Sequence, residues 1–179
     1  MTKRPEPRPP APAGSGADTD PSRAAIDAAI DAAIAENRDL RGATLPILHA
    51  IQDRLGYVPP AALDRIAKAL NLSRADVHGV LTFYHDFRTS PPGRHVLKLC
   101  RAEACQAMGC ERVERHLAER HGAAMHGTTS DGRLTVEPVY CLGNCALSPS
   151  LLLDGRVHGR VTPERLDALL AGLAAEERA

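Results

Sequence analysis

Hydrophobic residues recur at two different spacings in the two halves of the chain. Between residues 24 and 84 they recur every three or four positions, which predicts four helices, over residues 24–41, 45–55, 60–70 and 74–84. Gly56 is placed to end the second helix, Pro60 favours the start of the third, and Ser73 can cap the fourth. The first half therefore predicts a helical module over residues 23–90.

The pattern changes after the turn at Pro91-Pro92-Gly93. Short runs of apolar and β-branched residues, with a turn at Asp154-Gly155, predict strands over residues 95–99, 134–139, 151–153 and 156–158. Helical spacing predicts one helix over residues 111–121 and a last one that begins at Thr162-Pro163. Residues 91–179 are thus expected to form a small sheet with helices on it, and the fold class is α+β, an N-terminal helical bundle followed by an α/β domain.

Residues 1–22 mix Pro, Gly, Ser and charged side chains without periodicity, which predicts a disordered tail. This segment lacks the apolar core of a secretory signal, so we expect a cytoplasmic protein. No apolar run approaches the ~20 residues needed to cross a bilayer, and we expect no direct membrane insertion.

The charge balance argues against nucleic-acid binding. The chain has 22 Lys and Arg against 22 Asp and Glu, a formal net charge of zero. Duplex nucleic acid requires a basic excess to neutralise its phosphates. Eight histidines are scattered with no metal-ligand spacing that repeats on one face, and no phosphate loop or catalytic triad can be singled out.

Five cysteines in a reducing compartment indicate metal or redox chemistry more than disulfides. Cys100 and Cys105 follow the first predicted strand of the second half, and Cys141 and Cys145 follow the next one. Residues that leave neighbouring strand ends lie together at one sheet edge, so the two pairs can meet there. Four thiolates, two for each iron, are what a [2Fe–2S] cluster needs.

Two other interpretations of the cysteines remain open. A structural zinc site also uses four thiolates, although its ligands are usually spaced more tightly. Each cysteine could instead be a small buried hydrophobe. The fifth, Cys110, lies near the start of a predicted helix, and we expect it to pack in the core and not to bind metal.

Residues 100–109, Cys-Arg-Ala-Glu-Ala-Cys-Gln-Ala-Met-Gly, and residues 141–146, Cys-Leu-Gly-Asn-Cys-Ala, resemble the thioredoxin-like [2Fe–2S] subunit family of NADH dehydrogenases. Leu-Gly-Tyr-Val-Pro at residues 55–59 and Gly-Val-Leu-Thr-Phe-Tyr at residues 79–84 are also similar to that family. The resemblance covers about residues 45–170. Within the family, the Arg-Ala-Glu-Ala stretch looks most like the gamma subunit of soluble, NAD-dependent molybdenum formate dehydrogenases.

The resemblance implies a thioredoxin-like C-terminal domain whose [2Fe–2S] cluster is bound by Cys100, Cys105, Cys141 and Cys145. It implies a non-catalytic electron-transfer subunit that exchanges single electrons with the FMN of an NAD-binding flavoprotein partner, with a larger molybdenum formate dehydrogenase subunit in the same complex. The alternatives are the equivalent subunit of respiratory complex I or of an NAD-linked hydrogenase. A different class, an iron–sulfur redox-sensing regulator, is suggested by a helix-turn-helix outline over residues 63–84.

Overall fold

The computed structural model describes residues 22–176, so the tail predicted over residues 1–22 lies outside the described residues except for Ser22. Contacts within the described chain divide it into two compact units at the junction of Pro92 and Gly93. Each unit has its own hydrophobic core. Among residues 22–176 no helix combines the length and the apolar character that a bilayer span requires.

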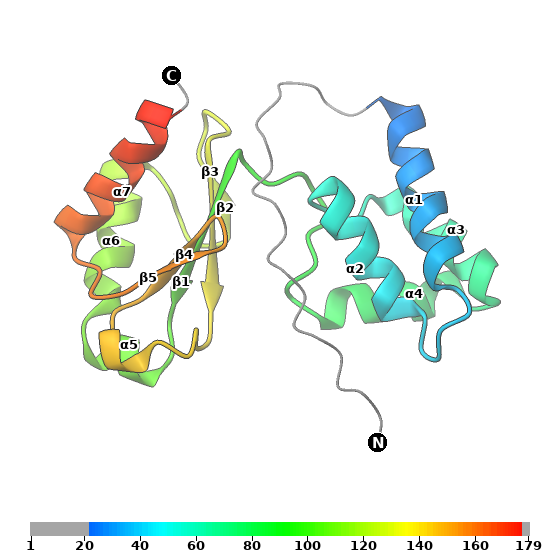
Figure 1. Cartoon of the computed structure of the whole chain (residues 1–179), viewed down its shortest axis with the longest axis horizontal. Helices are drawn as coiled ribbons and strands as arrows, with labels where there is room; N and C mark the ends of the chain where they lie inside the picture. The colour runs from blue at the N-terminus through cyan, green and yellow to red at the C-terminus, as the bar shows by residue number, and fades with distance from the viewer. Residues whose placement is uncertain (1–21, 177–179) are drawn as a thin grey trace. The chain divides into compact units, whose positions relative to one another are not determined.

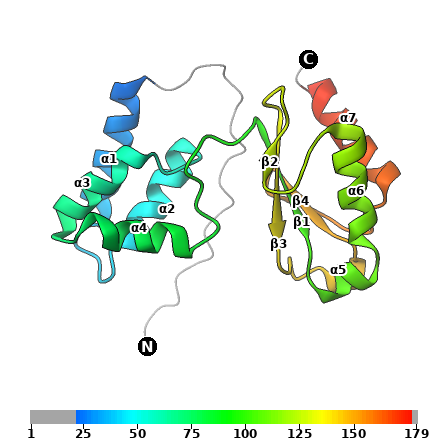
Figure 2. The ribbon, with the colours of Figure 1, turned by 180° about the vertical axis from the view of Figure 1, so that it is seen from behind.

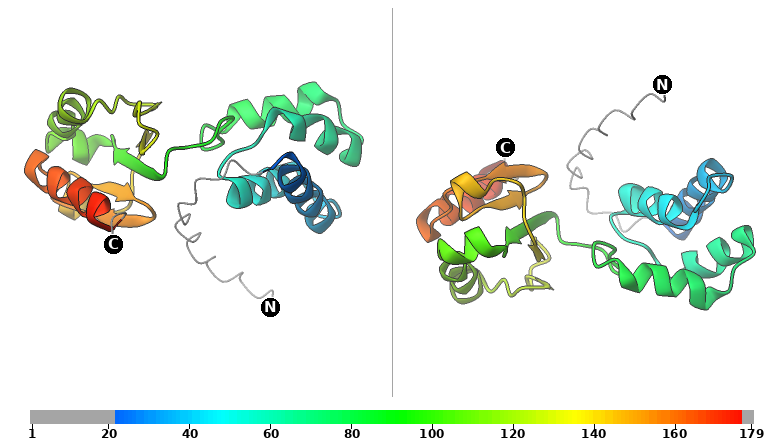
Figure 3. Two further views of the ribbon diagram at one scale, coloured as in Figure 1. Left: turned by 90° about the horizontal axis from the view of Figure 1, so that it is seen from above. Right: turned by 90° about the horizontal axis from the view of Figure 1, so that it is seen from below.

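The first unit consists of four helices that pack on one another, as seen from above and below in Figure 3. They are α1 (Arg23–Asn37), α2 (Thr44–Leu55), α3 (Pro60–Leu70) and α4 (Arg74–Phe83). The core of the bundle is aliphatic, and its fully buried side chains include Ile30, Ile47, Leu48, Ile51, Ile66 and Val77. The apolar stripes predicted from the sequence are therefore the faces that the four helices bury.

Local signals set the helix ends much as expected. Gly56 caps α2 with a φ of 81°, a conformation that glycine adopts without strain. Ser73 and Asp76 form a reciprocal capping box at the start of α4. The first helix is shorter than predicted, because it ends at Asn37 and a turn carries the chain from there to α2.

The second unit holds a five-stranded mixed sheet and three α-helices. Its elements are β1 (His95–Cys100), α5 (Glu103–Ala107), α6 (Cys110–His121), β2 (Gly127–Thr128), β3 (Leu134–Val139), the 3-10 turn η1 (Cys145–Leu147), β4 (Leu151–Leu153), β5 (Arg156–His158) and α7 (Pro163–Glu176). The short elements α5, β2 and η1 were not predicted from the sequence. The sequence did predict the α+β fold class, and the structure confirms it.

Strand β1 lies at the centre of the sheet, whose order is β2-β3-β1-β4-β5. It pairs in parallel with β3 and antiparallel with β4, while β4 and β5 form the predicted hairpin. Helices α6 and α7 lie side by side on one face of the sheet (Figures 1 and 2). Leu97 and Leu99 of β1 are completely buried and pack with Leu117 of α6 and Leu166 of α7.

Candidate metal centre

The ends of β1 and β3 bring two cysteine-containing loops to the same edge of the sheet. Cys100 is the last residue of β1, and its partner in the parallel ladder is Val139, the last residue of β3. The pairing continues one step further, because the Arg101 backbone N–H donates to the Val139 carbonyl at 2.8 Å. Both loops therefore start from neighbouring points, as the sequence led us to expect.

The first loop buries its two cysteines. Cys100 is 3% exposed and Cys105, held in the one-turn helix α5, is 2% exposed. The Gln106 side chain donates to the Arg101 carbonyl at 2.8 Å and fixes the turn between them. The Cys105 thiol lies 3.5 Å from the Ser148 hydroxyl, which belongs to the segment that follows the second loop.

The second loop presents its two cysteines at the surface. Cys141 has a φ of 90°, which is strained for a residue with a side chain. Gly143, at φ 73°, turns its backbone N–H toward Cys141 Sγ at 3.4 Å. Cys145 begins η1, and its Sγ lies 3.7 Å from that of Cys141.

Hydrogen bonds from the segment before β4 hold the second loop in place. Asn144 Nδ2 donates to Ser150 Oγ at 3.1 Å, and Ser150 Oγ lies 3.2 Å from the Leu147 carbonyl. The Ser148 hydroxyl donates to the Cys145 carbonyl at 2.8 Å. These bonds position Cys145 through its own backbone and that of its neighbours.

The environment of Cys100 favours the thiolate form that a metal requires. Burial raises the pKa of this thiol, but hydrogen bonds outweigh burial and lower the pKa overall. The donors are the backbone N–H groups of Ala102, Cys141 and Leu142, together with the Cys105 thiol. Two of these N–H groups come from the second loop, so the first cysteine is held by both loops.

The four sulfurs are close enough to influence one another. The pKa of the Cys145 thiol is raised by its hydrogen bond with Cys141 and by the charge on that residue, and further by burial and by the charges of Cys105 and Cys100. Mutual repulsion of this kind arises when thiolates gather without a cation between them. A positive metal centre among the four sulfurs would remove it.

Cys110 has a different environment. It is completely buried at the start of α6 and packs with Cys100 and Cys105 in a small cluster that also contains Val139 and Leu142. Burial is the main cause that raises the pKa of its thiol. Cys110 thus packs in the interior beside the site, as predicted.

The spacing of the sulfurs differs from that of a single tetrahedral site. A tetrahedral zinc site with Zn–S bonds of ~2.3 Å would place all four sulfurs ~3.8 Å apart. The Cys141–Cys145 separation of 3.7 Å suits two ligands of one metal. Within residues 22–176, however, no three cysteine sulfurs lie within 4.8 Å of one another. The four sulfurs therefore do not form the compact tetrahedron that a single zinc ion would require.

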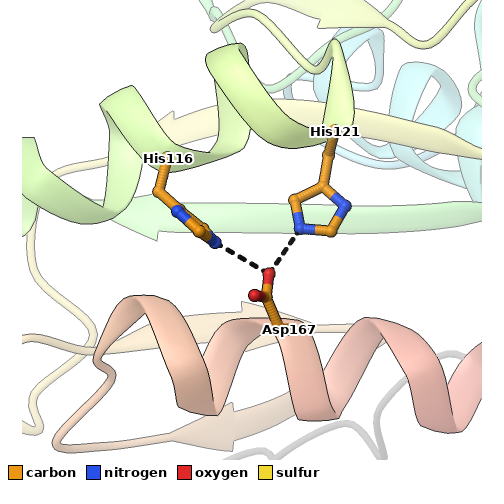
Figure 4. A group of neighbouring side chains, drawn as sticks. All are labelled: His116, His121 and Asp167. Atoms are coloured by element: carbon orange, nitrogen blue, oxygen red, sulfur yellow. Dashed lines mark hydrogen bonds and ion pairs between the residues drawn. The ribbon is translucent and has the colours of Figure 1, made fainter.

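A second group of side chains that could bind a metal was not predicted from the sequence. His116 and His121 of α6 and Asp167 of α7 bring their ligand atoms within 4.8 Å of one another (Figure 4). The two histidines are five residues apart, and Asp167 lies on another helix. Neither the spacing of the two histidines nor the position of Asp167 belongs to a recognisable motif. Only the packing of α6 on α7 reveals the group.

Comparison with known proteins assigns most of the chain. The sequence model of the family "Thioredoxin-like [2Fe-2S] ferredoxin" matches residues 30–174. The E subunit of the NADH-quinone oxidoreductase of Pseudomonas aeruginosa is 36% identical over 132 residues, which are 74% of this chain and 80% of that protein. A second E-type subunit of the same kind of enzyme, from Rhizobium meliloti, is 38% identical over 149 residues, covering 83% of this chain and 89% of that protein.

A solved structure shows a similar chain in another kind of enzyme. The crystal structure of an NAD+-reducing [NiFe]-hydrogenase in the air-oxidized state contains a similar chain, with a TM-score of 0.62 and 26% identity. The match covers 74% of this chain but only 23% of the hydrogenase chain. This protein is therefore similar to one part of that larger polypeptide.

Proposed function

The chain belongs to the thioredoxin-like [2Fe–2S] ferredoxin family, and we propose that Cys100, Cys105, Cys141 and Cys145 hold its [2Fe–2S] cluster. The single observation that carries this assignment is the convergence of two cysteine pairs at the ends of the parallel strands β1 and β3. The four cysteines fit a [2Fe–2S] cluster, because four thiolates in two pairs supply two ligands to each iron. When bound, the cluster supplies reversible one-electron chemistry.

The protein residues set the conditions for that chemistry. Backbone N–H groups of Ala102, Cys141 and Leu142 point at the Cys100 sulfur, and that of Gly143 points at the Cys141 sulfur. Such bonds stabilise negative charge on sulfur and raise the reduction potential. Burial of Cys100 and Cys105 keeps water from one side of the site, whereas Cys141 and Cys145 leave the other side accessible.

We propose that the accessible side contacts a flavoprotein subunit that binds FMN and NAD(H). The relatives are components of an NADH-quinone oxidoreductase and of an NAD+-reducing hydrogenase, whose names imply a step between NAD(H) and one-electron carriers. Three large apolar side chains close to the cysteines in sequence are unusually exposed. They are Met108 at 58%, Tyr140 at 74% and Leu147 at 39%. Exposed apolar side chains of this size are typical of a protein interface.

A finer proposal concerns the parent complex. The Arg-Ala-Glu-Ala stretch at residues 101–104 supports a soluble, cytoplasmic, NAD-dependent molybdenum formate dehydrogenase, in which a larger subunit would oxidise formate. The respiratory and hydrogenase complexes named by the relatives are the alternatives. In each case this chain is an electron carrier and the hydride chemistry belongs to a partner.

The redox-sensing regulator is the less favoured class. Helices α3 and α4 are joined by only three residues, which matches the outline of a helix-turn-helix. Two of the three Lys and Arg residues in residues 63–84 are already paired, however: Arg65 with Asp27 and Asp31, and Arg74 with Asp64 at 3.0 Å. Paired cations leave little charge with which to bind DNA phosphates.

The test is the spectrum and metal content of anaerobically purified protein before and after dithionite. Two irons and two sulfides per chain, with an electron paramagnetic resonance signal that appears on reduction, are expected. One zinc per chain and a colourless protein would refute the electron-carrier assignment. Co-purification of tagged chain from its source, followed by assays of NAD+ reduction with formate, hydrogen or quinol, then identifies the parent complex.

A further inference from the structure

The structure points to a second metal site, away from the cysteines, which we propose is formed by His116, His121 and Asp167 and binds a divalent transition ion of the Zn²⁺ type. Two imidazole nitrogens and one carboxylate oxygen form a ligand set that zinc uses in proteins, with a fourth position left for water. Among residues 22–176, no other set of three potential ligands converges within 4.8 Å.

The two histidine side chains converge on a common point. His116 Nε2 lies 2.8 Å from Asp167 Oδ1, and His121 Nε2 lies 2.7 Å from the same oxygen. Figure 4 shows both rings pointing from α6 toward this carboxylate on α7. In each ring, Nε2 therefore points at Asp167 Oδ1. A metal bond to Nε2 forms in the same direction, so an ion bound by both rings would lie near the position of this oxygen.

An ion requires only a small expansion of this group. With metal–nitrogen and metal–oxygen bonds of ~2.0–2.2 Å at tetrahedral angles, ligand atoms lie ~3.3 Å apart. The two hydrogen-bonded N···O pairs are at 2.8 and 2.7 Å, so each must lengthen by about half an ångström, and the two Nε2 atoms already lie within 4.8 Å of each other. A neutral ring moves its proton from Nε2 to Nδ1 when the metal binds, and a protonated ring releases one proton to water.

Rigid elements carry the three ligands. His116 lies next to Leu117 on α6, and Asp167 lies next to Leu166 on α7, and both leucines are buried in the core of the unit. The ligand side chains themselves are between 24% and 33% exposed, which leaves them accessible to an ion from solution. A site on two packed helices loses little conformational entropy when it binds metal.

Neighbouring charged side chains orient the carboxylate and are themselves exposed to water. Arg120 Nε lies 3.3 Å from Asp167 Oδ2, which holds the second oxygen and leaves Oδ1 toward the histidines. The Arg120 side chain is 67% exposed, so water screens its positive charge. Glu164, one turn before Asp167, adds a negative charge that acts on His116.

The site is separate from the cysteine centre. Cys110 begins α6, and His116 and His121 lie about 9 Å and about 16 Å from it along the helix axis. An ion between α6 and α7 would therefore join the C-terminal helix to the unit without taking a cluster ligand. The proposal stands on the geometry of these three residues alone and does not depend on the parent complex.

The test is zinc binding to the full chain with its iron centre intact, its affinity tag removed and any bound zinc first stripped with a mild chelator. Calorimetric titration with Zn²⁺ should give one site, and the variants His116→Gln, His121→Gln and Asp167→Asn should each weaken it at least about tenfold. His78→Gln is the matched control, because His78 is an exposed helical histidine outside the group, and it should leave the affinity unchanged.

X-ray absorption at the zinc edge separates this site from the thiols. Nitrogen and oxygen ligands with imidazole scattering, and no sulfur, are expected. Equal affinity in wild type and in the three variants, sulfur in the zinc shell, or no stoichiometric binding at all would overturn the proposal and leave the group as a hydrogen-bonded contact between two helices. Circular dichroism of each variant checks that it has folded.

Discussion

Cys100 and Val139 are direct partners in the parallel β1–β3 ladder, although two helices and a further strand separate them along the chain. This pairing makes the loop after β1 and the loop after β3 neighbours. All four proposed ligands lie in those two loops or at their ends. The position of the candidate centre is therefore a consequence of strand pairing.

Serine in place of any of the four proposed ligands should weaken retention of the iron centre, because an alcohol is a far poorer ligand for iron than a thiolate. Cys110→Ser should retain it, since Cys110 is a packing residue. Iron and sulfide content after anaerobic gel filtration is the measurement. Cys110→Ala serves as a second variant, because a buried hydroxyl can itself reduce stability. Loss of iron in both Cys110 variants would contradict the assignment.

Gly159→Ala should disturb the second cysteine loop. A Cβ at this position would lie 2.6 Å from the Leu147 Cβ and 2.9 Å from the Leu147 carbonyl oxygen, in the turn that Cys145 begins. We expect a loss of about 1–3 kcal/mol in the free energy of unfolding, as in other overpacked sites, and faster loss of iron to a chelator.

The matched control for that variant is Gly172→Ala in α7, where a Cβ meets nothing within 4 Å. This change should be neutral or slightly stabilising, because alanine favours a helix over glycine. Urea unfolding followed by circular dichroism measures both variants. Equal stability of the two would show that the second loop tolerates a side chain at residue 159.

Opposite charges near the first loop should shift the reduction potential in opposite directions. Arg101 Nη1 lies 2.7 Å from Glu114 Oε2, and Arg101 directly follows Cys100 in sequence. Arg101→Gln should lower the potential and Glu114→Gln should raise it, because reduction adds a negative charge to the centre. A unit charge ~10 Å away at an effective dielectric constant of about 30 contributes about 1 kcal/mol, or tens of millivolts. Potentiometric titration measures the reduction potential of each variant. Shifts of the same sign in both variants would show that the two charges are not the cause.

The helical unit should lose stability in acid through its capping box. Hydrogen bonds from the Ser73 side chain and backbone lower the pKa of Asp76. A carboxyl whose pKa is lower in the folded state stabilises the fold above its unfolded pKa of about 3.9, and this stabilisation is lost as the pH falls through the folded value. Thermal unfolding of wild type between pH 6 and 2 should show the loss.

Ser73→Ala removes the partner and isolates this effect. It should cost about 1 kcal/mol at neutral pH, the usual value for an N-cap. It should also flatten the dependence of the melting temperature on pH, because Asp76 then loses its side-chain partner. An unchanged pH dependence would assign the acid sensitivity to other carboxyl groups.

The sequence predicted what depends on local spacing and strand order. Cys100 and Cys141 follow strands whose apolar residues are readily recognised, so their meeting at one sheet edge followed from the parallel pairing. Helix α5, which positions Cys105, is only five residues long, and β2 is only two. Elements this short bury too few side chains to create a periodic pattern.

The histidine–aspartate group could not be predicted for a different reason. His116 and His121 lie on α6, and Asp167 comes to them only because α7 packs on the same face of the sheet. No spacing within either helix encodes that contact. Strand pairing can be inferred from chain order, whereas the rotation of one helix against another is set by side-chain packing in three dimensions.

The two cysteine pairs of the candidate centre differ in how firmly the sheet holds them, because β1 is its central strand. Cys100 lies on a strand that is hydrogen-bonded on both sides, so changes there would propagate into the whole sheet. Cys141 and Cys145 lie in an exposed loop beyond the end of β3. Substitutions between them can therefore alter how the protein meets its partner, or how readily it accepts an electron, while the core that defines the fold stays the same.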